Sequence, residues 1–234
     1  MRDRLRSIRA AAALDDDTRQ RIYAFVRAEA RPVTREEVAL RVGISRKLAA
    51  FHLDKLLERG LLAAHYARPP GRSGPGAGRS SKMYQPSDLE IEISIPERRY
   101  DFLGEILVDA IERGGRGESS RLAATRVAQE RGHALGAGVR RRKTVRPAGR
   151  ERTLSVAATV LQEQGFEPLR VAPDEIALRN CPFRTLAQQA PDLVCEMNRA
   201  FLEGFLAGLG STAVDAVLTR RPDACCVSLK ASAR

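Results

Sequence analysis

The sequence predicts an α+β fold in two parts, and three observations support this. Helical and strand-like apolar patterns follow one another along a chain of 234 residues, which is long enough for two modest domains. Hydrophobic residues make up 43% of the chain and aromatic residues only 5%, so we expect a core built mainly from Ala, Leu and Val. Positive charge is concentrated in the first part: residues 1–86 hold 18 Lys and Arg against 9 Asp and Glu, whereas residues 87–234 hold 22 against 20.

The uneven charge indicates that the first third binds a polyanion such as nucleic acid. The alternative is that arginine is simply the ordinary surface residue of this chain. No apolar run approaches the roughly 18–20 residues that span a bilayer, and the apolar stretch near the N-terminus is too short for a secretory signal. We expect a cytoplasmic protein with no membrane partner, whose four cysteines bind metal or sense redox state rather than form disulfides.

Three helices are predicted between residues 15 and 60, and each begins at a residue that can cap it. Asp15–Asp17 place acceptors and negative charge at the start of the first helix. Thr34 and Glu37 have the spacing of a capping box for the second helix. Ser45 caps the third. A flexible N-terminus is expected before them, at residues 1–14.

The second and third helices have the spacing of a helix-turn-helix. Ala39 places a small residue where the helices cross, and Gly43 suits the tight turn between them. Gly60 suits the left-handed conformation that ends the third helix. An apolar stripe on the third helix leaves other side chains available for base edges or phosphates; the alternative for any one of them is a solvated surface residue. Those expected to contact DNA are Ser45, Arg46, Lys47, Ala50, Phe51 and Lys55.

Two strand-like runs joined by a basic loop follow the third helix. The runs are Leu61–Tyr66 and Lys82–Tyr84, and the loop between them is rich in Gly, Pro and Ser. A strand, a basic loop and a second strand directly after a recognition helix form a wing, which binds the minor groove or phosphates. The loop lacks the Gly-Lys-Ser/Thr ending of a nucleotide-binding P-loop. The wing residues expected at the DNA are Arg68, Arg72, Arg79 and Lys82, which completes a winged helix-turn-helix domain at residues 15–88.

An amphipathic helix at Tyr100–Glu112 is predicted to be a dimerisation helix, within a linker region at residues 89–115. Two-domain regulators commonly pair subunits through such a helix, and most DNA sites have two-fold symmetry. The alternative is that the helix packs on its own C-terminal domain. The basic stretch Gly138–Arg152 is expected to be a solvated connection between helices, with a second DNA contact as the alternative.

Residues 116–234 are predicted to form a mixed α/β sensor domain that contains all four cysteines. The expected elements are a helix at Leu154–Gly165, strands at Leu169–Ala172 and Glu175–Asn180, a helix from Pro191 to about Leu209, and a closing strand at Ala224–Lys230.

The cysteine spacing does not match a zinc ribbon or a local ferredoxin run. Cys181 lies at a strand end, Cys195 on the following helix, and Cys225 and Cys226 on the closing strand. Distant cysteines can still converge in a fold, and thiolates are the ligands that Fe–S clusters need. The alternative is that each cysteine is a small buried apolar residue.

Several segments together resemble a known family. The chain resembles ArsR-like predicted regulators that include the SufR iron–sulfur repressors. The resemblance lies in GISRKLAAFHLDKLLERGLL, GPGAGRSSKMY and IPERRYDFLGEIL, and in the later GFEP, NCPF, Leu-Val-Cys-x-Met-Asn and CCVSL. One departure is Ser80, where proline is expected after the wing arginine. The resemblance covers roughly residues 15–230 and implies an Fe–S cluster, of the 2Fe–2S or 4Fe–4S type, held by Cys181, Cys195 and one of the last two cysteines. It also implies iron–sulfur assembly genes as targets.

Strand geometry favours Cys225 over Cys226 as the third ligand. Side chains alternate across a strand, so Cys225 shares the apolar face with Val227, and that face is expected to point inward. Cys226 is the alternative. The fourth cluster position is left for a group other than these cysteines.

The resulting hypothesis is a homodimeric repressor that binds an inverted repeat in double-stranded DNA and senses iron–sulfur or redox status. Its rivals are a winged helix regulator whose C-terminal domain binds an organic ligand or another metal and, more remotely, a Cys-dependent enzyme. We expect no enzymatic activity, because no His has the sequence context of a base partner for a reactive cysteine. An RNA-binding role lacks an aromatic stacking platform.

Overall fold

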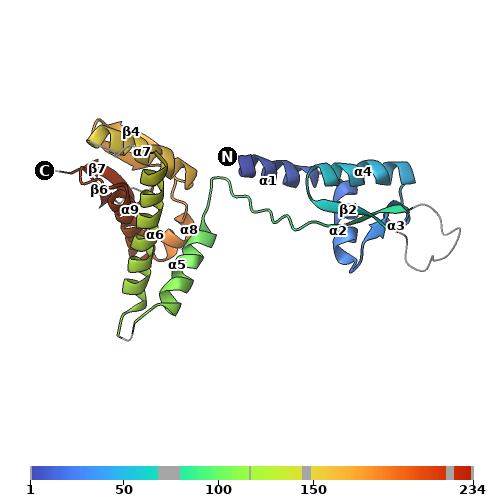
Figure 1. The fold of residues 1–234 in the computed structure, drawn as a ribbon, viewed down its shortest axis with the longest axis horizontal. Helices are drawn as coiled ribbons and strands as arrows, with labels where there is room; N and C mark the ends of the chain where they lie inside the picture. The colour runs from blue at the N-terminus through green and yellow to red at the C-terminus, as the bar shows by residue number, and fades with distance from the viewer. Residues whose placement is uncertain (1, 68–79, 116, 144–148, 220–223, 233–234) are drawn as a thin grey trace. The chain divides into compact units, whose positions relative to one another are not determined.

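The computed structural model describes residues 2–67, 80–115, 117–143, 149–219 and 224–232. They belong to two compact units, Met1–Ile93 and Ser94–Arg234 (Figure 1). The elements of the first unit are α1 (Arg2–Ala13), α2 (Asp17–Ala28), β1 (Val33–Thr34), α3 (Arg35–Val42), α4 (Arg46–Glu58), β2 (Leu62–Ala67) and β3 (Ser81–Pro86). Those of the second unit are α5 (Tyr100–Glu112), α6 (Ser120–Lys143), α7 (Arg150–Glu163), β4 (Pro168–Ala172), β5 (Glu175–Leu178), α8 (Arg184–Gln189), α9 (Pro191–Leu209), β6 (Val214–Leu218) and β7 (Val227–Ala231). The predicted mixture of helices and strands is confirmed.

The predicted helix caps of the first unit are confirmed. Asp16 accepts a hydrogen bond from the backbone of α2, and Ser45 accepts one at the start of α4. Thr34 forms the complete capping box of α3. Gly43 and Gly60 both have φ of 74°, the left-handed conformation that a glycine adopts without strain.

The N-terminal residues differ from the prediction of a flexible segment. They form α1, and Ala10 on this helix is fully buried within the core of the first unit. The Ala-rich run has high helix propensity, and the short Ala10 side chain allows the helix to approach closely. Packing of Ala10 into the core therefore orders a segment that was predicted to be flexible.

The first unit packs its helices on a three-stranded sheet with the order β1-β3-β2. All pairings are antiparallel, and Ala64 of β2 lies opposite Tyr84 of β3. The core includes Ile22 and Val26 of α2 and Leu53 of α4. Only one face of α4 is buried, and the side chains on its other faces are at least partly exposed. The first residues after the Ser45 cap, Arg46 and Lys47, are among the exposed ones.

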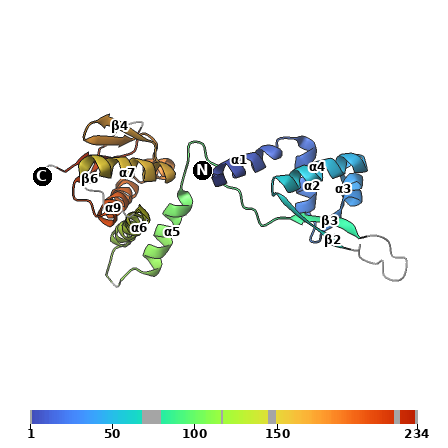
Figure 2. The same cartoon turned by 45° about the horizontal axis from the view of Figure 1, so that its top comes forward.

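The second unit contains a four-stranded antiparallel sheet with the order β4-β5-β7-β6. Helices α7 and α9 both contact this sheet. Figure 2 shows α7 next to β4 and α5 alongside α6. The cysteines of this unit lie in three segments: directly after β5, in the first turns of α9, and directly before β7.

Several element boundaries differ from the prediction: α7 begins at Arg150 rather than Leu154, and β5 ends at Leu178 rather than Asn180. The closing strand begins at Val227 rather than Ala224, because the backbone at Cys225 and Cys226 bonds outside the regular ladder, to Leu178 and Thr219. The basic stretch 138–152 is largely helical where the structure describes it, since α6 continues to Lys143 and α7 begins at Arg150. Arginine is a good helix former, so a charged run does not by itself end a helix.

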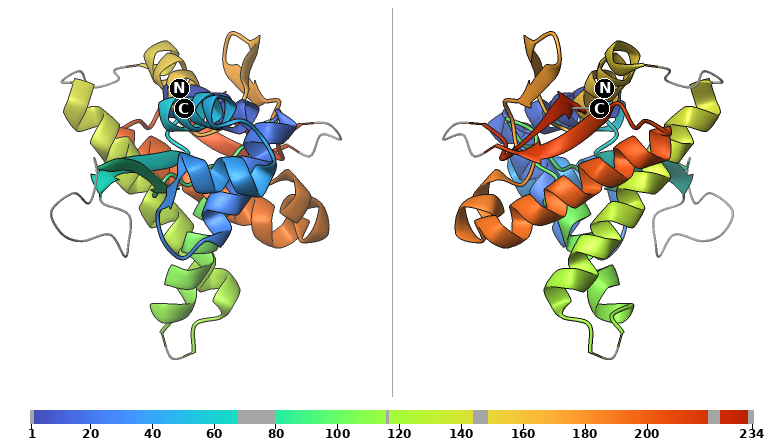
Figure 3. Two further views of the ribbon diagram at one scale, coloured as in Figure 1. Left: turned by 90° about the vertical axis from the view of Figure 1, so that its right-hand side faces the viewer. Right: turned by 90° about the vertical axis from the view of Figure 1, so that its left-hand side faces the viewer.

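Helices α6 and α9 approach each other through glycines. The right-hand view of Figure 3 shows the two helices crossing. A Cβ atom built on Gly132 would lie 1.9 Å from the carbonyl oxygen of Phe201, and one on Gly204 would lie 2.0 Å from that of Gln129. Any larger residue at these positions would therefore have to separate the helix backbones.

No helix in the described part of the chain is both long and apolar enough to span a membrane.

Candidate DNA-binding surface and thiol site

The first turns of α4 are exposed. Ser45, Arg46 and Lys47 are all open to solvent, Ala50 is half-buried, and the Phe51 side chain is 54% exposed. A large exposed aromatic ring on a helix between basic residues is suited to apolar contact with a base, such as a thymine methyl group. The structure thus presents the residues predicted for the reading helix on one accessible stretch.

Two of the three lysines predicted to contact DNA are partly engaged within the protein. Lys55 lies 3.0 Å from the Glu58 carboxylate, and its ammonium group lies 6.0 Å from the centre of the Phe51 ring. Lys82 is 2.8 Å from Asp54, and this hydrogen bond raises the pKa of Lys82. A DNA phosphate would therefore compete with a carboxylate for each of these two lysines. The predicted wing residues Arg68, Arg72 and Arg79 lie outside the described residues.

The second unit brings two of the four cysteines together in its core. Cys181 follows β5 and is 5% exposed, and Cys225 precedes β7 and is 3% exposed. Cys226 and Cys195 are both half-buried. Cys225, which was preferred over Cys226 as the third ligand, is thus the more buried of the two. Neither Cys225 nor Cys226 lies within a strand, because β7 begins at Val227.

The two buried thiols interact directly. A hydrogen bond from Cys225 lowers the pKa of Cys181, and the backbone N–H of Phe183 and the positive charge of Arg98 act in the same direction. The pKa of Cys225 is raised, first because it donates to Cys181, next by its hydrogen bond with Cys226, and further by its burial. Cys181 is accordingly the thiol of the pair that ionises first.

An asparagine completes this group. Asn198 on α9 is only 2% exposed, and its Nδ2 donates a 3.1 Å hydrogen bond to Cys225 Sγ. Its Oδ1 is buried and has no hydrogen-bond partner among the described residues. Cys195 lies three residues earlier on the same helix, a spacing that places both side chains on one face. We call Cys181, Cys225 and Asn198 the thiol site.

A second asparagine holds the backbone around Cys181. Asn180 Oδ1 accepts a 2.5 Å hydrogen bond from Arg98, and its Nδ2 donates to the carbonyl oxygens of Gly165 (2.6 Å) and Glu97 (3.0 Å). Arg98 also donates to the carbonyl oxygen of Cys181, at 3.2 Å. This network joins the segment before α5, the turn after α7 and the end of β5, and so determines where Cys181 lies.

The Fe–S cluster that the sequence resemblance implies would need several sulfur ligands gathered at one place. Within the described ranges, no three His, Cys, Asp or Glu side chains are grouped so that they could hold a metal ion. The thiol site nevertheless offers two buried sulfurs, the soft ligands that an Fe–S cluster requires, and an amide oxygen that lacks a partner. The described residues do not group a third His, Cys, Asp or Glu side chain with these two sulfurs in a way that could hold a metal ion.

Asn180, Asn198 and Arg98 were not predicted from the sequence. The one signal for Asn198 was its position, since it lies three residues after a cysteine and among the buried apolar residues of α9. Asn180 directly precedes Cys181, but nothing in the local pattern indicates its three distant partners.

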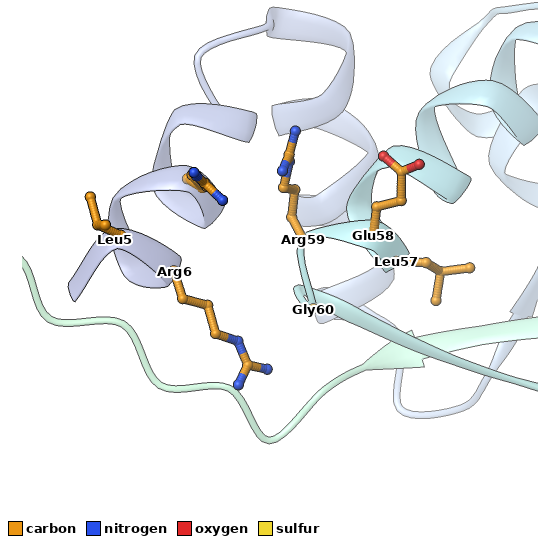
Figure 4. Close-up of a pocket in the computed structure, with 7 residues that line it drawn as sticks. Leu5, Arg6, Leu57, Glu58, Arg59 and Gly60 are labelled. Atoms are coloured by element: carbon orange, nitrogen blue, oxygen red, sulfur yellow. The ribbon is translucent and has the colours of Figure 1, made fainter. Parts of the chain in front are cut away.

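A hollow of about 540 Å³ occurs in the first unit, between α1 and the end of α4. It is lined by Leu5, Arg6, Arg9, Leu57, Glu58, Arg59 and Gly60 (Figure 4). Figure 4 shows the side chains of Arg6 and Arg59 pointing away from each other, so these two guanidinium groups do not converge on one ligand.

Comparison with known proteins agrees with the geometry of the first unit. A family model described as a helix-turn-helix domain matches residues 14–64, the stretch from just before α2 into β2. A search of curated proteins found no match. The matched stretch contains α3, the glycine turn and α4, with the exposed basic residues at the start of α4. Residues 14–64 therefore form a helix-turn-helix domain, which supports a DNA-binding transcriptional regulator.

Proposed function

We propose that this protein is a winged helix-turn-helix repressor that binds double-stranded DNA as a homodimer and holds an Fe–S cluster in its second unit. The observation that carries the DNA-binding part is the helix-turn-helix match, combined with the exposed Arg46 and Lys47 at the start of α4. The antiparallel β2–β3 pair after α4 supports a wing. An inverted repeat is the operator expected for a two-fold symmetric dimer.

Helix α5 supports the homodimer. Leu103 and Ile106 are buried within the core of the second unit, whereas Val108 and Ile111 on the same helix are largely exposed. The helix thus packs on its own unit, which was the alternative to a dimerisation helix. It also presents the apolar side chains of Val108 and Ile111 to solvent. A second copy of the chain is the partner that we propose for them.

The DNA-binding proposal is tested by Arg46→Ala. Removal of a guanidinium group from the reading helix is expected to weaken binding to a duplex operator about 10- to 100-fold, or about 1–3 kcal/mol. The measurement is fluorescence anisotropy with labelled DNA at several salt concentrations, because the salt slope reports phosphate contacts. The control is Arg113→Ala, which removes the same charge from an exposed ion pair with Glu130 in the second unit. Equal affinities for Arg46→Ala, Lys47→Ala and the unaltered protein would contradict α4 as the reading helix.

We propose Cys181, Cys195 and Cys225 as the cysteine ligands of the cluster, with Cys226 as the alternative third ligand. The contact between Cys181 and Cys225 and the burial of both side chains support these two ligands, whereas Cys195 is proposed from the sequence resemblance. When bound, the cluster supplies redox- and iron-dependent chemistry. The protein's own part is to exclude water around the two buried thiols and to hold their sulfurs close together. Occupancy of this site is proposed to control operator affinity, with iron–sulfur assembly genes as targets.

The cluster proposal is tested by anaerobic purification. Protein from iron-replete cells is expected to be coloured and to contain iron and sulfide, and a colourless, iron-free protein would overturn this part of the proposal. Cys181→Ser and Cys195→Ser are each expected to abolish the chromophore, whereas Cys226→Ser keeps it. The reverse result for the adjacent pair, with Cys225→Ser coloured and Cys226→Ser colourless, would assign the third ligand to Cys226. Metal analysis distinguishes an Fe–S cluster from another metal or an organic ligand.

A further inference from the structure

We propose that Asp54 on α4 determines sequence specificity: its carboxylate holds Lys82 in the free protein and accepts a hydrogen bond from a cytosine or adenine amino group in the DNA complex. This inference rests on the proposed function, because it assigns a role within the DNA-binding surface of the first unit. Asp54 is a carboxylate among basic residues predicted to contact DNA, where a negative charge opposes the binding of phosphates.

The first argument is the position of Asp54 on the exposed face of α4. Lys47, Phe51 and Asp54 have the spacing i, i+4 and i+7, which places their side chains along one side of a helix. All three are exposed, and the Asp54 side chain is 60% accessible. A helix that presents Lys47 and Phe51 to the major groove therefore also presents Asp54, one turn further along.

The second argument is the partner of Asp54 in the free protein. Its Oδ1 accepts a 2.8 Å hydrogen bond from Lys82 on β3, and this bond is the main cause of the raised pKa of Lys82. The pair joins the reading helix to the strand pair that follows it. A DNA phosphate that takes Lys82 must release the carboxylate, and a carboxylate released at a DNA surface then needs a hydrogen-bond donor.

The third argument is the chemistry of the major groove. A carboxylate accepts hydrogen bonds and cannot donate them. Guanine N7 and O6 and thymine O4 are acceptors as well, whereas cytosine N4 and adenine N6 carry amino groups that donate. DNA that lacks an amino group at this place either leaves Asp54 without a partner or leaves Lys82 on Asp54 and away from the phosphates. Both costs fall on unrelated sequences, so Asp54 increases the discrimination between an operator and other DNA.

The experiment compares Asp54→Ala with the unaltered protein on a duplex that the unaltered protein selects from a random pool. In matched duplexes each cytosine or adenine is replaced in turn by 2-pyrimidinone or purine, which lack the amino group. The unaltered protein should bind about tenfold more weakly at one such position of a half-site, and Asp54→Ala should change by less than about twofold there. On a duplex of unrelated sequence, Asp54→Ala should bind about 3- to 10-fold more tightly, because Lys82 is free for a phosphate.

Glu58→Ala is the matched control. Glu58 pairs with Lys55 at 3.0 Å on the same helix, so its removal also frees a lysine and changes the charge equally. Both variants place alanine, a strong helix former, at an exposed position and should fold normally. Glu58→Ala should bind unrelated DNA more tightly and still be sensitive to the missing amino group.

Two results would separate the failure of this inference from the failure of the proposed function. If Asp54→Ala keeps the same sensitivity to the missing amino group as the unaltered protein, Asp54 does not read a base and the inference is overturned, whatever its effect on unrelated DNA. An unaltered protein that selects and binds no duplex would overturn the DNA-binding proposal itself.

Discussion

Gly204→Ala is expected to destabilise the second unit by about 3–5 kcal/mol. The added Cβ would lie 2.0 Å from the carbonyl oxygen of Gln129 and 2.9 Å from its carbonyl carbon, and neither backbone atom can rotate away as a side chain can. Relief of the clash requires α6 and α9 to separate along their length, and packing around the fully buried Phe205 is then lost. Overpacking of this kind exceeds the usual cost of one extra methyl group in a core.

Urea unfolding followed by circular dichroism is the measurement for Gly204→Ala. The control is Gly138→Ala on α6, where the nearest atom to the added Cβ is the end of a flexible arginine side chain, 4.0 Å away. Because alanine favours a helix over glycine, that variant should be more stable by about 0.5–1 kcal/mol. Two alanine substitutions of opposite sign in one helix pair would demonstrate close backbone contact. A Gly204→Ala variant within about 0.5 kcal/mol of the unaltered protein would contradict it.

Asn180→Ala is expected to cost about 3 kcal/mol and to expose the Cys181 thiol. The substitution deletes the acceptor of the Arg98 hydrogen bond and the donor to the Gly165 and Glu97 carbonyl oxygens. Hydrogen bonds to a charged group contribute about 1.5–3 kcal/mol, and buried groups left without partners add to the loss. Because Arg98 also bonds to the Cys181 carbonyl oxygen, the end of β5 loses its fixed position as well.

Two measurements test Asn180→Ala. Urea unfolding gives the free energy, and the rate of thiol labelling under native conditions reports access to Cys181. The control is Gln189→Ala, which removes an exposed carboxamide at the end of α8 and should change the stability by less than about 0.5 kcal/mol. Unchanged labelling of Asn180→Ala would show that the network does not protect the thiol.

The parts of the fold predicted correctly from sequence are those determined by local interactions. The caps at Thr34 and Ser45 act within one helical turn, and Gly43 is recognisable because a left-handed turn favours glycine. The helix-turn-helix could therefore be derived from a single sequence. The positions of Arg46 and Lys47 on an exposed face followed from the apolar stripe of the same helix.

The features that sequence reasoning missed depend on contacts between distant residues. Nothing near Asn180 or Asn198 indicates that their partners lie many residues away, at Arg98 and Cys225. The glycines of α6 and α9 are equally uninformative alone, because a glycine within a helix normally weakens it. Their role emerges only once the two helices are placed side by side. Cys225 was assigned to a strand because the alternation of apolar residues does not reveal where the ladder begins.

The thiol site is drawn from segments that follow β5, lie on α9 and precede β7, and this separation along the chain has a thermodynamic consequence. An unfolded chain keeps these donors far apart, so the proposed metal group, which needs all of them together, would bind the folded state alone. By mass action, such a group at a free concentration 100 times its dissociation constant adds about 2.7 kcal/mol to the stability of the second unit. Loss of that group would then reduce both the occupancy of the site and the lifetime of the folded protein.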